Sequence, residues 1–195
     1  MSGLEVGGET LVSVDVETAG PVPALHSLLS IGACLVDDPE QGFYVELRPE
    51  LADSRPEAVA VSGLSMDELA RSGVPAAEAM AGFERWLGEV VPAGHTAVLV
   101  AFNAPFDWMF VADAFERHLG RNPFGHSALD IKAYAMAVTG STWADTSMRD
   151  LAPRFLAGRE LSHHALADAR DQAELFRVLR SERSTWPDPA ERTLR

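Results

Sequence analysis

The sequence predicts an α/β fold with a mixed sheet, in which an antiparallel three-strand meander is followed by βα units with flanking helices. Three observations support this: short apolar, β-branched runs near the N-terminus, apolar residues at helical spacing later in the chain, and turn-forming or capping residues between them. A length of 195 residues, 47% of them hydrophobic and 23% charged, fits one folded domain with its own core.

Three apolar runs near the N-terminus predict the meander. Along Leu11–Glu17, valines alternate with polar residues, so Asp15 and Glu17 share one face of a strand. Ser27–Val36 and Gly42–Arg48 are two further runs, separated by a stretch rich in turn-forming residues. We expect these three strands to lie side by side and antiparallel.

The middle of the chain changes to helical spacing. Ser65–Glu68 has the spacing of a capping box, and Pro75 opens a helical apolar pattern that continues to Val90. Ala97–Phe102 is a short buried strand that runs into Asn103, which we expect to cap the next helix.

The remaining elements follow in βα order. The Asn103 helix is expected to run to about Leu119, and Ser127–Ile131 reads as a strand end. Three further helices are predicted from apolar periodicity, at Ala133–Val138, Met148–Leu156 and Ala165–Glu182. The predicted domain spans residues 10–183, and we expect 1–9 and 184–195 to be flexible ends.

The charge balance narrows the classes of function. Sixteen Lys and Arg against 29 Asp and Glu give a net charge of −13, which excludes a nucleic-acid binder that coats phosphates with a broad basic surface. A local site where bound metal ions reverse the sign of the charge stays open. The single cysteine, Cys34, favours a cytoplasmic protein, and we expect neither a secretion signal nor a membrane span.

Four carboxylates recur where strands end and helices begin. Asp15 and Glu17 end the first strand, Asp107 falls in the first turn of the helix after Asn103, and Asp168 falls in the first turn of the last helix. A structural role is open for each of them alone, as solvent-facing strand residues or as first-turn acids that the helix dipole favours. Together they form a set of oxygen ligands typical of Mg²⁺ or Mn²⁺.

Two histidines, His163 and His164, come just before Asp168. Histidine exchanges a proton near neutral pH, which suits a general base acting on water. Helix capping is the structural alternative. Two divalent cations about 4 Å apart between such carboxylates clamp the attacking and leaving oxygens of a phosphodiester displacement.

These residues resemble the DEDDh family of 3′–5′ exonucleases, which includes proofreading exonucleases and ribonuclease T. The first motif is Asp15-Val16-Glu17-Thr18, the second runs from Asn103 to Asp107, and the third is His163-x-Ala165-x-x-Asp168. Three weak motifs in the correct order make a specific match. The resemblance implies a ribonuclease H-like fold and a 3′–5′ exonuclease domain that covers nearly the whole chain.

The resemblance also implies roles for individual residues. Two divalent cations, Mg²⁺ or Mn²⁺, would be held by Asp15, Glu17, Asp107 and Asp168, and His163 would take the proton from the attacking water. A sister subtype has a Tyr at the position of His164, but Ala165 fits the histidine subtype, so His163 is favoured. The residues implied to seat the 3′-terminal nucleotide are Thr18, Leu64, Asn103 and Phe106.

The hypothesis is therefore a metal-dependent 3′–5′ exonuclease that releases nucleoside 5′-monophosphates. Its acidic surface favours 3′ ends of short single strands, DNA or RNA, over long duplexes. Two alternatives stay open: a catalytically weak module that binds nucleic-acid ends or a protein partner, and a phosphohydrolase acting on small nucleotides. A homodimer is compatible with the family, and the choice between DNA and RNA depends on contacts to the 2′-OH.

Overall fold

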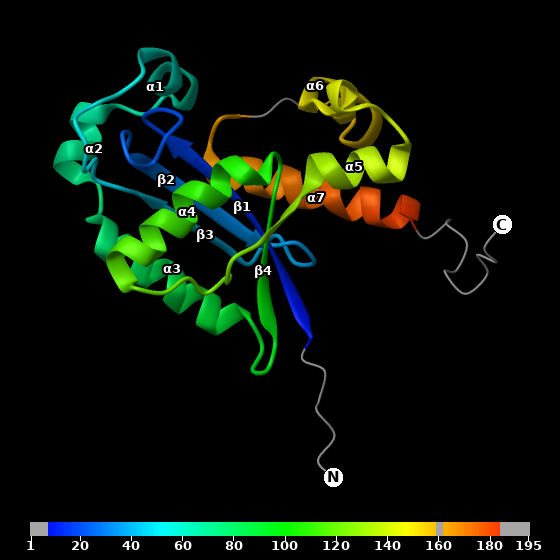
Figure 1. Cartoon of the computed structure of the whole chain (residues 1–195), viewed down its shortest axis with the longest axis horizontal. Helices are drawn as coiled ribbons and strands as arrows, with labels where there is room; N and C mark the ends of the chain where they lie inside the picture. The colour runs from blue at the N-terminus through cyan, green and yellow to red at the C-terminus, as the bar shows by residue number, and fades with distance from the viewer. Residues whose placement is uncertain (1–7, 159–161, 184–195) are drawn as a thin grey trace, which may run out of the picture.

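A mixed five-stranded sheet forms the centre of the protein (Figure 1). The structure is a computed structural model that describes residues 8–158 and 162–183. The strand order is β3-β2-β1-β4-β5. This α/β architecture confirms the predicted fold class. The strands are β1 Glu9–Thr18, β2 Leu28–Leu35, β3 Gly42–Glu46, β4 Thr96–Ala101 and β5 Ala128–Asp130.

The predicted meander is confirmed. β1 and β2 are antiparallel, as are β2 and β3, whereas β4 and β5 continue the sheet in parallel with β1. β1 begins at Glu9, inside the segment expected to be a flexible end, because Glu9 and Thr10 pair with the start of β4. The rest of the two expected flexible ends, 1–7 and 184–195, lies outside the described residues.

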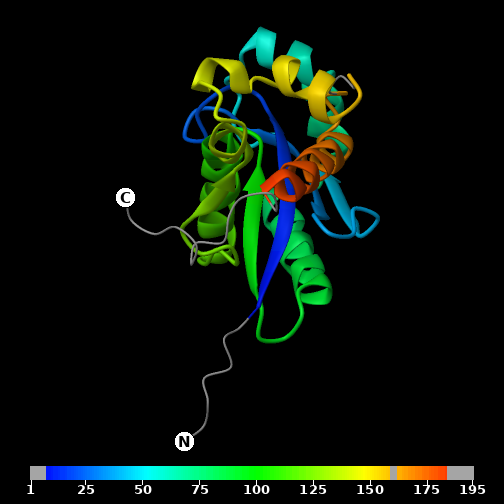
Figure 2. The same cartoon turned by 90° about the vertical axis from the view of Figure 1, so that its right-hand side faces the viewer.

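Helices cover both faces of the sheet (Figure 2). α3 and α4 bury one face around Phe83, Phe110 and Phe115, and α5 and α7 bury the other around Ile131 and Phe176. No helix in the described part of the chain is long and apolar enough to cross a membrane. The helices are α1 Pro56–Ser62, α2 Met66–Ser72, α3 Ala76–Val90, α4 Ala104–Leu119, α5 Ile131–Thr139, α6 Met148–Phe155 and α7 Ala165–Arg183, with a 3₁₀ turn, η1, at Trp143–Thr146.

Local sequence rules account for the starts of α2 and α3. The Ser65 side chain accepts a hydrogen bond from the Glu68 N–H and caps α2, as predicted. Pro75 directly precedes α3, also as predicted. α1 was not predicted: only Pro56 marks its start, and Gly63, with a φ of 66°, ends it in the left-handed conformation.

The start of α7 lies directly against β2. A Cβ atom on Gly32 would stand 2.1 Å from the Ala165 carbonyl carbon and the Leu166 nitrogen, a separation that any side chain would forbid. Gly32 is the β2 partner of Asp15 in the sheet register. The glycine therefore lets the first turn of α7, with Asp168, come close to the carboxylates of β1.

Candidate active site

The carboxylates of β1 face α7. Asp15 Oδ1 accepts a hydrogen bond from Gln172 Nε2 on α7 at 2.6 Å. Gln172 is 2% exposed, and its Oε1 accepts from the Phe102 N–H at 2.9 Å. The amide is thus held at both ends and orients the Asp15 carboxylate.

Asp107 lies at an edge of β1 that lacks a neighbouring strand. The pairing of β1 with β4 ends at Ser13, because β4 ends at Ala101. Farther along, the Val16 N–H donates to Asp107 Oδ1 at 3.1 Å. Asp107 is in the first turn of α4 and is buried, so its carboxylate supplies the hydrogen-bond acceptor that the Val16 N–H lacks within the sheet.

Asp168 organises the segment that precedes α7. Its Oδ1 accepts from the Ser162 N–H at 2.8 Å and from the Ser162 hydroxyl at 3.0 Å, and its Oδ2 accepts from the His163 N–H at 2.9 Å. One ligand atom from each of Glu17, His163 and Asp168 lies within 4.8 Å of the others. Motifs from the two ends of the chain therefore meet at one point.

The two adjacent histidines have different surroundings. His163 belongs to the cluster with Glu17 and Asp168. The His164 ring instead stacks on Tyr44 of β3, with centroids 4.4 Å apart and planes at 22°. This arrangement favours the prediction of His163 over His164 as the proton acceptor.

Backbone strain occurs at two of the predicted site residues. His163 has a φ of 54° and Asn103 a φ of 64°, a left-handed conformation that costs about 1–2 kcal/mol for most residues and less for asparagine. The expectation that the Asn103 side chain caps α4 is wrong, since it makes no capping hydrogen bond. Asp130 Oδ1, at the end of β5, accepts from the Ala104 N–H at 3.1 Å instead.

Crowding and burial raise the pKa of three of these carboxyls. Burial, followed by repulsion from Asp107 and Glu17, raises the pKa of Asp15 well above its ordinary value. Burial and the charge of Asp168 raise the pKa of Glu17 to about 7. Burial raises the pKa of Asp107 to about 8, although N–H donors such as Val16 oppose the shift.

The donor set fits hard divalent cations. Among the ion pairs between described residues, none involves Asp15, Glu17, Asp107 or Asp168. Carboxylates that repel one another with no Lys or Arg between them are stabilised by a cation of higher charge. The four carboxylates supply the oxygen ligands that Mg²⁺ and Mn²⁺ prefer.

An open hollow of about 350 Å³ adjoins Glu17. Its lining includes two of the residues predicted to seat a nucleotide, Thr18 and Phe106, but neither Leu64 nor Asn103. Leu64 packs instead against a small core of Ala19, Leu29 and Leu69. The hollow is therefore bounded by the end of β1, by α1 and by the first turn of α4.

Three residues that position or line the site were missed by sequence reasoning. Gln172 holds Asp15, Gly32 admits α7, and Val61, 53% exposed on α1, lines the hollow. Gln172 lies four residues after Asp168, one helical turn away, so the helical period offered a clue to its position. Val61 begins a segment, 61–65, that resembles the family's loop near the terminal nucleotide, although Leu64 was the residue chosen from it. No feature of the sequence indicated that Gly32 would approach the site.

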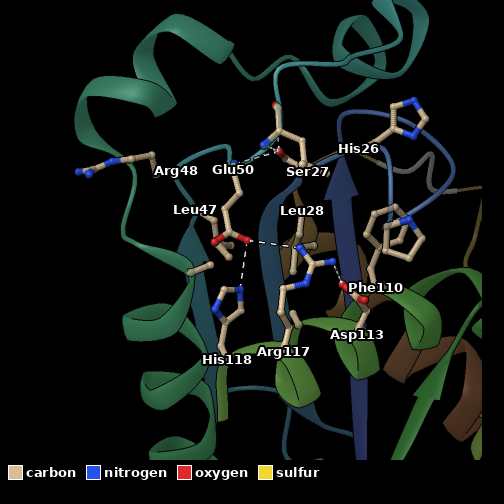
Figure 3. Close-up of a pocket in the computed structure, with 14 residues that line it drawn as sticks. His26, Ser27, Leu28, Leu47, Arg48, Glu50, Phe110, Asp113, Arg117 and His118 are labelled. Atoms are coloured by element: carbon tan, nitrogen blue, oxygen red, sulfur yellow. Dashed lines mark hydrogen bonds and ion pairs between the residues drawn. The ribbon is translucent and has the colours of Figure 1, made fainter. Parts of the chain in front are cut away.

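A second, smaller pocket, of about 20 Å³, lies between α4 and the segment after β3 (Figure 3). His118 Nε2 lies 3.1 Å from Glu50 Oε2 there, and Arg117 bridges Glu50 and Asp113. The space suffices for about one water molecule. Its acids are paired with basic groups, which is typical of a structural cluster.

The chain is similar to known exonucleases. The sequence model of the RNase T family, described as Exonuclease, matches residues 12–176. The chain is 44% identical over 171 residues to the 3′-5′ DNA exonuclease Cap18 of Escherichia coli, covering 88% of this chain and 91% of that protein. It is 32% identical over 194 residues to ribonuclease T of Escherichia coli O157:H7, covering 92% and 89% of the two chains.

Solved structures share the fold. The nuclease domain of 3′hExo, a DEDDh family member bound to rAMP, superposes with a TM-score of 0.71 at 16% identity, covering 89% of this chain and 93% of that one. A zinc-bound E. coli exonuclease I complex with single-stranded DNA gives a TM-score of 0.68 at 22% identity. The match covers 91% of this chain but 42% of exonuclease I. Both likenesses bear out the ribonuclease H-like fold.

Proposed function

This chain belongs to the RNase T family of exonucleases and is a 3′–5′ exonuclease, and from that premise we propose that it shortens single-stranded DNA, releasing nucleoside 5′-monophosphates. The observation that carries the proposal is the meeting of Glu17, His163 and Asp168 within 4.8 Å. Asp15 and Asp107 complete the carboxylate set around that point.

Asp15, Glu17, Asp107 and Asp168 are proposed to hold two divalent cations, Mg²⁺ or Mn²⁺. When bound, such ions supply an activated water and stabilise the charge that develops on the attacking and leaving oxygens. The carboxylates themselves are fixed before binding: Gln172 orients Asp15, and the Val16 N–H orients Asp107. Fixed ligands lower the cost of reorganisation in the reaction.

His163 is proposed to accept the proton of the attacking water. Its ring lies beside Glu17 and Asp168, and its backbone N–H is anchored by the same Asp168 carboxylate. The side chain is exposed, so the imidazole can pass the proton on to solvent. Position and chemistry together suit a general base.

The hollow beside Glu17 is proposed to receive the 3′-terminal nucleoside. Its volume of about 350 Å³ falls within the usual range for small-ligand sites, about 300–1,000 Å³. Phe106 and Val61 offer apolar surface to the base. The net charge of −13 disfavours long duplexes and favours a single-stranded end. DNA is favoured over RNA because the relative at 44% identity is named a DNA exonuclease.

Labelled oligonucleotides test this proposal. Single-stranded DNA and RNA of one sequence, labelled at either end, are incubated with Mg²⁺ or Mn²⁺ and followed in time. We expect stepwise shortening from the 3′ end, faster on DNA, that stops in EDTA. His163→Ala should lower the rate by about 10²–10⁴-fold, the usual contribution of a general base.

His164→Ala is the matched control, because its ring stacks on Tyr44 outside the metal cluster. It should keep most of the activity. A larger loss in His164→Ala than in His163→Ala would overturn the assignment of the base. Faster shortening of RNA would overturn the choice of DNA, and no shortening of any strand would overturn the proposed function.

A further inference from the structure

A cation and two aromatic rings form an open platform at the start of α5. Lys132 Nζ lies 4.3 Å from the centroid of the Trp143 ring and 5.8 Å from that of Phe102. Trp143 is 50% exposed, and Met136, one helical turn after Lys132, is 39% exposed. Large apolar side chains on a soluble surface mark interaction sites when they cluster.

The charge of Lys132 has no carboxylate partner in the part of the chain that the structure describes. Among the ion pairs between described residues none involves Lys132. The two nearest acids in sequence are engaged elsewhere: Asp130 accepts from the N–H groups of α5 and α4, and Asp145 accepts from the Thr142 hydroxyl at 2.6 Å. Lys132 is the only lysine in a chain with a net charge of −13, so this platform offers an anion a local positive charge.

The platform lies beside the end of the sheet that carries Asp15 and Glu17, which is the catalytic edge of the proposed exonuclease. Phe102, whose ring faces Lys132, donates its N–H to Gln172, which in turn holds Asp15. β1, β4 and β5 are parallel, so their carboxyl ends, the carboxylates and the start of α5 all lie at one edge.

The platform and the hollow lie on opposite sides of that edge. In Figure 1 the tip of β1 lies between α1 and the helices α5 and α6. The hollow is lined by α1 and the first turn of α4, whereas Lys132 and Trp143 belong to α5 and η1. The carboxyl end of β1 therefore lies between the hollow and the platform.

We propose that Trp143 and Lys132 form a subsite for the nucleotide on the 5′ side of the scissile phosphate. The exposed part of the Trp143 ring stacks on its base, and Lys132 binds the next phosphate of the strand. Stacking on an aromatic side chain is independent of base identity and suits an enzyme that must accept any sequence. The inference rests on the proposed function, because it assumes a strand with its 3′ end at the carboxylates.

Two substrates separate this subsite from the catalytic centre. The p-nitrophenyl ester of thymidine 5′-monophosphate carries the terminal nucleoside and the scissile phosphate, with nitrophenolate in place of the upstream strand. Oligothymidylate of about ten nucleotides adds the upstream strand, at a length typical of single-strand sites. The readout is the ratio of kcat/KM for the oligomer to kcat/KM for the ester.

Trp143→Ala should lower this ratio about tenfold, the scale of one lost base–aromatic contact. Lys132→Gln should lower it too and should reduce the salt dependence of the oligomer's KM by about 0.7 in the log–log slope, the value for one phosphate contact on a single strand. Arg180→Gln is the matched control. It removes one positive charge near the far end of α7, where Arg180 lies over Phe176 and pairs with Asp37, and should keep the ratio and the slope of the wild type.

Each outcome decides between the two inferences. If the wild type cleaves both substrates and neither platform variant changes the ratio, the subsite is wrong and the exonuclease stands. An equal change of ratio in Arg180→Gln assigns the effect to overall charge and also overturns the subsite. If the wild type cleaves neither substrate, the proposed function is wrong and the subsite with it.

Discussion

Two groups of acids in this protein have opposite surroundings. At the catalytic edge, Asp15 and Glu17 face Asp168 with no basic partner among the described residues. In the pocket of Figure 3, Glu50 and Asp113 are bridged by Arg117. The first group is crowded and largely buried, and the second is partly exposed and paired.

The difference separates the acids that we propose to bind cations from the acids of a structural cluster. Paired surface acids contribute little to stability, about 0–1 kcal/mol per pair. Unpaired buried acids lower stability, and burial and repulsion hold the pKa of Glu17 at about 7 and of Asp107 at about 8. A cluster of unpaired buried acids does not stabilise the fold, so its presence points to a bound cation.

The largest expected effect follows from removing one charge at the catalytic edge. Asp15→Asn keeps the shape and the contact with Gln172, yet should lower kcat/KM about 1,000-fold, on the scale of several kcal/mol supplied by a metal. In EDTA its Tm should rise by about 3 °C, or about 1 kcal/mol for a chain of this length, because repulsion is relieved. Activity assays measure the expected fall in kcat/KM, and thermal unfolding in EDTA measures the expected rise in Tm. A lower Tm would contradict the idea that the unpaired acids destabilise the fold.

The next effect concerns how α7 reaches the catalytic edge. Gly32→Ala places a methyl group 2.1 Å from the backbone of Ala165, so the first turn of α7 must move and carry Asp168 away from Glu17. Activity should fall about 100-fold, the cost of a misplacement of about 1 Å. Gly88→Ala on α3, where a Cβ meets nothing within 4 Å, is the control and should be stabilising by up to about 1 kcal/mol. Equal activities in the two variants would show that close packing at Gly32 is dispensable.

Gln172 tests whether fixing the orientation of Asp15 contributes to activity. Gln172→Leu removes both of its hydrogen bonds, to Asp15 and from Phe102. We expect activity and apparent metal affinity to fall about 10–100-fold, as for residues that orient metal ligands. Titration of Mg²⁺ or Mn²⁺ against rate separates the effects: excess metal should partly restore the variant. A loss that no metal concentration relieves would assign Gln172 a purely structural role.

The pH dependence of stability should reveal the unpaired acids in the protein without metal. Glu17 and Asp107 have folded-state pKa values of about 7 and about 8, above unfolded values near 4. Between about pH 4 and pH 8 the folded state therefore binds more protons, so the free energy of unfolding falls as pH rises. Thermal unfolding in EDTA from pH 5 to pH 8 measures this slope. Added Mg²⁺ or Mn²⁺ should reduce the slope by stabilising the ionised carboxylates, and an unchanged slope would contradict metal binding there.

The smallest effect is expected at the paired acids. Glu50→Gln weakens contacts with His118 and Arg117 at a site where the Glu50 side chain is 43% exposed. The free energy of unfolding should change by less than about 1 kcal/mol, and exonuclease activity should stay near that of the wild type. Denaturant unfolding and the oligonucleotide assay measure both. A large loss of activity would place the Figure 3 pocket in the substrate path.

Local pattern was sufficient for the strands and most helices. The alternating valines of β1, the Ser65 cap and the Pro75 start each depend on neighbouring residues alone, and each was predicted. α1 was missed because its seven residues carry no apolar stripe, and its only buried residue is Ser62. The capping role of Asn103 was wrong because Asp130, 27 residues later in the chain, satisfies the same helix end.

The sequence by itself determined the chemistry: which carboxylates and which histidine are present, in what order, and on strand ends and helix starts. Only the tertiary structure decided which of them meet. Glu17 and His163 are far apart in the chain and come together because Gly32 admits α7 against the sheet. The stacking of His164 on Tyr44 and the contact of Gln172 with Asp15 both depend on how α7 and the segment before it pack on the sheet. Periodicity and capping act between residues close in sequence, whereas a site is built from contacts between distant segments, which only the folded chain brings together.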